Sequence, residues 1–89
     1  YYTLVGRRAM ILKVPAYKCL NEGEVMVSIY VDRQGVVREA YIMDNGSTDD
    51  ECIREQAVQA ALHSVFTAKE DAPEIQYGDI RYIFIAQER

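Results

Sequence analysis

Hydrophobic and polar residues alternate between Gly23 and Asp44, and this pattern predicts two antiparallel strands at the centre of the fold. One face of the first strand is entirely apolar, with Val25, Val27, Ile29 and Val31 at every second position. Such spacing is typical of a strand with one buried face. Arg33-Gln34-Gly35 interrupts the pattern with a glycine that can adopt positive φ, and a second strand follows from Val36. We therefore predict a β-hairpin that the rest of the chain covers.

The second strand of this hairpin contains a break in its alternation. Val37 and Ala40 are three residues apart, whereas Ala40 and Ile42 are two apart. Both apolar sets can face the core only if the strand contains a bulge. We predict this bulge near Arg38 and Glu39.

An amphipathic helix is predicted from about Asp49 to Ser64. Thr48, followed three residues later by Glu51, matches a capping box with Thr48 as the N-cap. Apolar and small residues then repeat at helical spacing, as Cys52/Ile53, Gln56/Ala57, Ala60/Ala61 and Ser64/Val65. Because this stripe is rich in alanine, the helix can lie close against a sheet, and Phe66 is expected to fill the end of the core.

A last strand is predicted from Asp79 to Gln87, after a polar loop and a turn at Tyr77-Gly78. Residues 1–14 form an N-terminal extension, in which Gly6 separates two short extended segments. The order extended segment, strand, strand, helix, strand predicts one α+β domain that spans residues 1–89. Its architecture is a two-layer sandwich in which one main helix covers a three-stranded antiparallel sheet.

Charge and hydropathy limit the classes of partner. The net charge of −4 argues against a nucleic-acid surface, which needs a basic patch. No apolar run approaches the roughly 20 residues that span a bilayer, so we expect no membrane contact by this chain. The sequence begins at Tyr1 without Met, and we expect it to be part of a longer protein.

Catalytic chemistry finds no support in the sequence. Cys52 and His63 share a helix face but lie roughly 16 Å apart along its axis, too far for a hydrogen bond. There is one His and no Cys-x-x-Cys pair, so neither a metal site nor a cofactor is expected. Cys19 and Cys52 can form one disulfide or remain two buried thiols, and composition leaves both open.

A small three-stranded sheet leaves at least one edge unpaired unless another segment covers it. The hydrophobic last strand, Ile80 to Ala86, is the best candidate for strand addition by a peptide. The N-terminal segment or a second copy of the chain, as a homodimer through edge strands, can cover the same edge.

Three segments together resemble the C-terminal domains of the TonB family, over about Pro15 to Phe84. The hairpin reads Gly23-x-Val25-x-Val27-x-Ile29-x-Val31-Asp32-x-x-Gly35-x-Val37-x-x-Ala40-x-Ile42. The helix from Ile53 to Phe66 carries small residues and a closing aromatic, and the last strand reads Gly78-x-Ile80-x-Tyr82-x-Phe84. The family's Tyr-Pro motif near the domain start is only partly present, as Pro15-Ala16-Tyr17 followed by Lys18.

The resemblance implies a periplasmic, non-enzymatic protein-interaction domain that an inner-membrane anchor and a long linker precede. Such a domain binds a peptide of an outer-membrane transporter beside its last strand and passes energy to the transporter. The residues implied in partner binding are Ile80, Arg81, Tyr82, Ile83, Phe84 and Ile85, with Pro15 and Tyr17 at the domain start. A periplasmic location also favours a Cys19–Cys52 disulfide. The alternative is a scaffold module of the same fold, attached to another envelope sensor or lipoprotein, without energy transduction.

Overall fold

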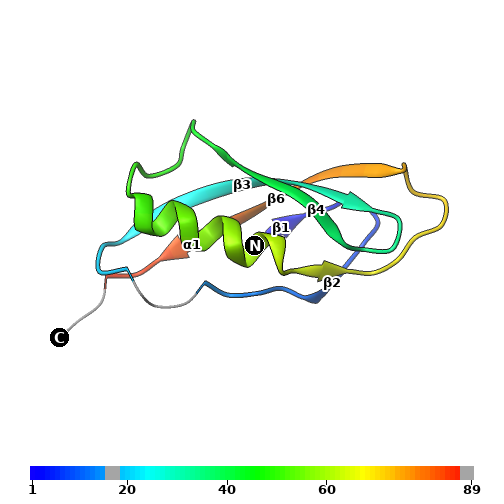
Figure 1. Ribbon diagram of the computed structural model, residues 1–89, viewed down its shortest axis with the longest axis horizontal. Helices are drawn as coiled ribbons and strands as arrows, with labels where there is room; N and C mark the ends of the chain where they lie inside the picture. Colours follow the sequence, from blue (N-terminus) through cyan, green and yellow to red (C-terminus); the bar gives the residue numbers. More distant parts are fainter. Residues whose placement is uncertain (16–18, 87–89) are drawn as a thin grey trace.

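A computed structural model of the chain describes residues 1–15 and 19–86, and its fold is α+β (Figure 1). The described part contains, in order, β1 (Tyr2–Thr3), β2 (Ala9–Ile11), β3 (Gly23–Asp32), β4 (Val37–Met43), α1 (Glu51–Leu62), β5 (Val65–Phe66) and β6 (Ile75–Phe84). The predicted order of hairpin, helix and last strand is confirmed. Residues 19–22, which precede β3, are not helical. Residues 16–18 lie outside the described part of the chain.

The main sheet has four strands in the order β1-β6-β3-β4, and its neighbours are antiparallel. The prediction of three strands was wrong, because the N-terminal segment adds β1 beside β6. β2 and β5 form a separate two-stranded sheet. Figure 1 shows α1 in front of the main sheet with the chain from β2 running alongside it. We call the sheet face that packs against α1 the inner face, and the opposite one the outer face.

The predicted hairpin is confirmed, and its apolar face forms the centre of the core. The four inner-face residues of β3 are all 0% exposed: Val25, Val27, Ile29 and Val31. In β4, Glu39 lies opposite Tyr30 and Val37 lies opposite Val31, which leaves Arg38 as an extra residue. The bulge is therefore where the spacing of the apolar residues predicted it.

α1 packs against the hairpin through the small residues that the sequence pattern predicted to be buried. Its buried positions are Ile53, Ala57, Ala60 and Ala61, and Phe66 just beyond it is fully buried. The predicted N-cap was wrong. Asp50, not Thr48, accepts the Ile53 N–H through its side chain, and the Thr48 hydroxyl instead accepts the Asp50 N–H. The helix consequently begins at Glu51, two residues later than predicted.

β6 begins at Ile75, four residues earlier than predicted, and Tyr77-Gly78 lies within the strand rather than in a turn. Gly78 is needed for close approach, not for a turn. A Cβ atom there would lie 2.6 Å from the Thr3 carbonyl oxygen and 2.8 Å from the Leu4 side chain. The missing side chain therefore makes room for the chain at the end of β1.

Arg7, in the turn between β1 and β2, is a buried cation that ties three segments together. Its side chain donates to the carbonyl oxygens of Thr67 at 2.9 Å and Asp32 at 2.8 Å, and more weakly to that of Arg33 and to the Gln76 side chain. Only 5% of Arg7 is exposed. The planar guanidinium can satisfy several acceptors at once, which a lysine ammonium in the same place cannot.

We expect Arg7→Lys to lower the free energy of unfolding by about 2–4 kcal/mol, because buried carbonyls lose a charged donor. Arg8→Lys is the matched control, since Arg8 is exposed and contacts Thr67 through its backbone. That variant should stay within about 0.5 kcal/mol of the wild type in urea denaturation. Equal effects of the two substitutions would show that Arg7 does not hold these segments.

Cys19 and Cys52 form a disulfide with a Cα–Cα distance of 5.8 Å. The bridge joins the segment before β3 to the first turn of α1, 33 residues away in sequence. Of the two alternatives that composition left open, the disulfide is the one that the structure contains. It restrains the end of the domain where β6 also terminates.

Replacement of both cysteines by serine should lower the free energy of unfolding by about 2–4 kcal/mol, because the unfolded chain regains the entropy of a long loop. Chemical denaturation of the oxidised and reduced wild type measures the same quantity. A reductant should have no effect on the double variant. If reduction leaves the wild type unchanged in stability, the bridge does not restrain the unfolded chain.

Candidate functional site: the β6 edge

β6 is fully paired on one side and only partly paired on the other. Toward β3 it is in register along its whole length, from Gly23 opposite Phe84 to Asp32 opposite Ile75. Toward the edge, β1 pairs with Asp79 and Ile80 alone. The Arg81 N–H also donates to the Tyr1 carbonyl oxygen at 2.8 Å. The N-terminal segment thus covers the middle of β6, which includes the first two residues of the predicted docking strand, Ile80 and Arg81.

Backbone groups of the remaining part of β6 point toward this edge. In a strand, the N–H and C=O of alternate residues face the same side. Because the Arg81 N–H faces β1, the backbone groups of Ile83 face the same edge. No strand of the described chain pairs with β6 there. Ile83 is also 68% exposed, so this end offers both backbone groups and apolar surface.

The side chains of the predicted docking strand divide between the two faces of the sheet. Ile80, Tyr82 and Phe84 are buried on the inner face. Arg81 and Ile83 are exposed on the outer face, and Ile85 is exposed just beyond the strand. Half of the predicted set therefore belongs to the core, and only the outer half can meet a partner through its side chains.

Pro15, one of the two residues predicted at the domain start, lies next to the end of β6. Val14, Pro15, Ile83 and Phe84 line a small cleft of about 30 Å³. The Tyr82 hydroxyl donates to the Lys13 carbonyl oxygen at 3.2 Å and holds this segment against the sheet. Burial raises the pKa of Tyr82, so the hydroxyl remains a donor at neutral pH. Tyr17, the other residue predicted at the domain start, lies outside the described residues.

A charged pair flanks the site on the outer face. Arg81 contacts Glu24 of β3 at 2.6 Å, and the carboxylate raises the pKa of the guanidinium. Both side chains are more than one-third exposed, so solvent screens the pair and it contributes little to stability. Its effect at this site is to fix the Arg81 side chain away from the β6 edge.

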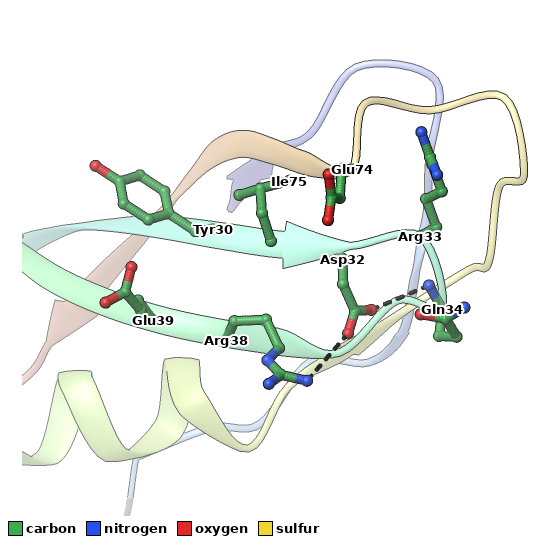
Figure 2. Close-up of a pocket in the computed structure, with 8 residues that line it drawn as sticks. All are labelled: Tyr30, Asp32, Arg33, Gln34, Arg38, Glu39, Glu74 and Ile75. Atoms are coloured by element: carbon green, nitrogen blue, oxygen red, sulfur yellow. Dashed lines mark hydrogen bonds and ion pairs between the residues drawn. The ribbon is translucent and has the colours of Figure 1, made fainter.

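A larger hollow, of about 600 Å³, lies at the hairpin loop (Figure 2). Its polar groups are largely occupied by structural contacts. Asp32 accepts the N–H groups of Gln34 and Val36 and pairs with Arg38 at 3.6 Å, while Arg33 donates to the Ala72 carbonyl oxygen. The hollow is open and mixed in charge, with no nucleophile beside a base among the residues that line it.

Cys52 and His63, which we considered from the sequence as a nucleophile and its base, each make a different structural contact. Cys52 is bonded to Cys19 and has no free thiol. His63 is the C-cap residue of α1, and its Nδ1 lies 2.7 Å from the Gln59 carbonyl oxygen. Within residues 1–15 and 19–86, no group of three or more His, Cys, Asp or Glu side chains could hold a metal ion.

Sequence reasoning missed the residues that decide how much of the β6 edge is covered. Thr3 and Leu4 pack at Gly78, and Arg7 anchors the turn that follows. A two-residue strand such as β1 is too short to produce a periodic signal. The one available signal was the glycine at position 78, because a glycine inside an apolar strand marks close approach of another backbone.

Comparison of the chain with protein-family models, with curated proteins and with solved structures found no match. In the part of the chain that the structure describes, no helix is both long and apolar enough to cross a membrane. The site therefore has to be interpreted from its own geometry and from the sequence pattern.

We expect Gly78→Ala to displace β1 from β6, because the added methyl group meets the Thr3 backbone, which cannot move aside alone. Hydrogen exchange at the Arg81 amide should become roughly tenfold faster, as one backbone bond is lost. Gly46→Ala is the control: no atom lies near its Cβ position, but its φ of 89° makes alanine strained. It should lower overall stability without a selective change at Arg81, and the same selective change in both variants would contradict the placement of β1.

Proposed function

We propose that this chain is a protein-interaction domain that binds an extended peptide by strand addition at the β6 edge. The observation that carries the proposal is the partial cover of that edge. β1 pairs with two residues of a ten-residue strand, and the exposed Ile83 follows beside an apolar cleft. Strand addition takes its affinity from main-chain hydrogen bonds and its selectivity from pockets for alternate side chains.

The geometry of the edge defines the kind of peptide that fits. A peptide strand beside Ile83 places alternate side chains on the two faces of the sheet. On the inner side they meet the cleft between Pro15 and Phe84, which has room for a small apolar group. On the outer side they meet the exposed Ile83 side chain. A short segment with apolar residues at alternate positions satisfies both faces.

Within this proposal, the domain is of the TonB C-terminal type and its peptide comes from an outer-membrane transporter. The arrangement of a bulged hairpin, an alanine-rich helix and a last strand beside the first hairpin strand supports this assignment. A disulfide suits an oxidising compartment such as the periplasm. In that setting the peptide contact would transmit energy from the inner membrane to the transporter.

The second candidate function is a scaffold module of the same fold in which β1 permanently caps the edge. The bond from Arg81 to Tyr1 and the close fit of Thr3 against Gly78 favour it. In this case the domain holds together a larger envelope protein, and peptide binding at β6 is absent. The two candidates differ in whether β1 can share or leave the edge.

Titration of the isotope-labelled chain with short transporter-derived peptides, followed by NMR, tests the proposal. We expect amide shifts from Ile80 to Ile85 and loss of binding in Ile83→Pro, which removes an edge-facing donor while the β3 ladder stays intact. Ile42→Pro, on the opposite edge of the sheet, is the matched control and should bind like the wild type. Shifts confined to other strands, or equal binding by both variants, would exclude the β6 edge as the site.

A further inference from the structure

The second edge of the sheet, along β4, has backbone groups that point out of the molecule. The Glu24 carbonyl accepts the Thr48 N–H, and the Met26 N–H donates to the Ser47 hydroxyl. These bonds show that even-numbered residues of β3 direct their backbone groups toward the β4 side. Since β3 and β4 are in register as Met26–Met43, Ser28–Tyr41 and Tyr30–Glu39, the odd-numbered residues of β4 are the ones bonded to β3.

The N–H and C=O groups of Ala40 and Ile42 therefore face away from β3. β4 is the last strand of the described sheet on this side, and no loop or cap backbone bond joins Ala40 or Ile42 to another described residue. The bulge at Arg38 ends the regular part of the strand at one side, and the turn after Asp44 ends it at the other. The strand available for pairing is short and defined at both ends.

We propose that two copies of this chain associate through antiparallel pairing of their β4 strands, about a two-fold axis at Tyr41. In this register Ala40 of one copy exchanges both backbone bonds with Ile42 of the second copy, and the reverse pair forms by symmetry. The two Tyr41 side chains meet on the outer face as a non-hydrogen-bonded pair, the arrangement in which cross-strand side chains lie closest.

Charge selects this register over its neighbours. Pairing centred on Tyr41 brings Arg38 opposite Asp44 of the second copy, twice in the dimer. Within one copy Arg38 pairs with Asp32 at 3.6 Å and Asp44 pairs with Arg54 at 2.6 Å. The Arg38 side chain is 62% exposed and that of Asp44 is 84% exposed, so each keeps solvent-facing surface for a further contact across the interface. A shift of the centre to Ala40 or Ile42 loses both opposite-charge pairs. A two-fold axis placed between two residues would bring outward-facing backbone groups of one copy opposite backbone groups of the second copy that are already bonded to β3.

The same geometry limits assembly to two copies. A two-fold contact uses the same edge of both molecules and closes on itself. The remaining edge, at β6, is partly covered by β1, which opposes continued growth of the sheet. The inference is independent of the proposed peptide site, because the two sites lie on opposite edges and can be filled together.

Sedimentation analysis of charge-reversal variants tests the dimer. We expect the wild type to dimerise with concentration, and Arg38→Glu or Asp44→Lys alone to weaken dimerisation by about tenfold, because each dimer then contains two like-charge pairs. An equimolar mixture of the two variants should recover dimerisation to within about threefold of the wild type, since both charge pairs are restored across the interface. Simple destabilisation of either variant cannot produce such recovery.

A second test does not depend on charge. Ile42→Pro removes an outward donor and should abolish the dimer, whereas Ile83→Pro on the opposite edge should leave it intact. Exchange of the Ala40 and Ile42 amides in the wild type should slow as concentration rises. A wild type that stays monomeric at NMR concentrations, a variant mixture that gains nothing, or protection at Ile83 instead of Ile42 would each overturn the proposal.

Discussion

The pairing of β3 with a strand on each side is the interaction on which the rest of this structure depends. β3 is bonded to β6 along its full length, and its pairing with β4 continues on both sides of the bulge at Arg38. Its four valine and isoleucine side chains are excluded from water and form the surface against which α1 packs. Because β3 is paired on both sides, the unpaired backbone groups of the described main sheet lie at its edges, along β4 on one side and along β1 and the part of β6 that β1 leaves uncovered on the other.

The two edges differ in how the chain deals with them. At β6 a segment of the same chain provides a partial cover, fixed by the buried Arg7 and by the space at Gly78. At β4 the cover is only a bulge and charged side chains, which limit an exposed edge without removing its hydrogen-bonding groups. This asymmetry is why we assign a peptide to one edge and a second copy of the chain to the other.

Long periodic segments were the parts that the sequence predicted well, for a physical reason. Val25 to Val31 must alternate because one face is buried, and the three-residue step from Val37 to Ala40 could be explained only by an extra residue. The helix stripe at Ala57, Ala60 and Ala61 was equally clear. The position of the N-cap was not, because Thr48 and Asp50 are both good capping residues and only tertiary contacts choose between them.

The candidate site was predicted in outline but not in its limits. The alternation around Ile80 and Ile83 identified a strand with two apolar faces, yet it could not show that Tyr1 to Thr3 pair with the first residues of that strand, Asp79 to Arg81. That addition depends on long-range contacts of Arg7 with Asp32 and Thr67, and on the space left at a glycine. None of these contacts leaves a repeating pattern in sequence.

The central claim is that the β6 edge is covered at Arg81 and open at Ile83. Hydrogen exchange of individual amides in the unmodified chain tests it most directly. We predict slow exchange at the Arg81 amide, which is bonded to Tyr1, and at the Tyr82 amide, which faces β3. We predict fast exchange at the Ile83 amide, which follows these two residues near the end of the strand. Protection at Ile83 equal to that at Arg81 and Tyr82 would show that the edge is closed and would contradict the proposed site.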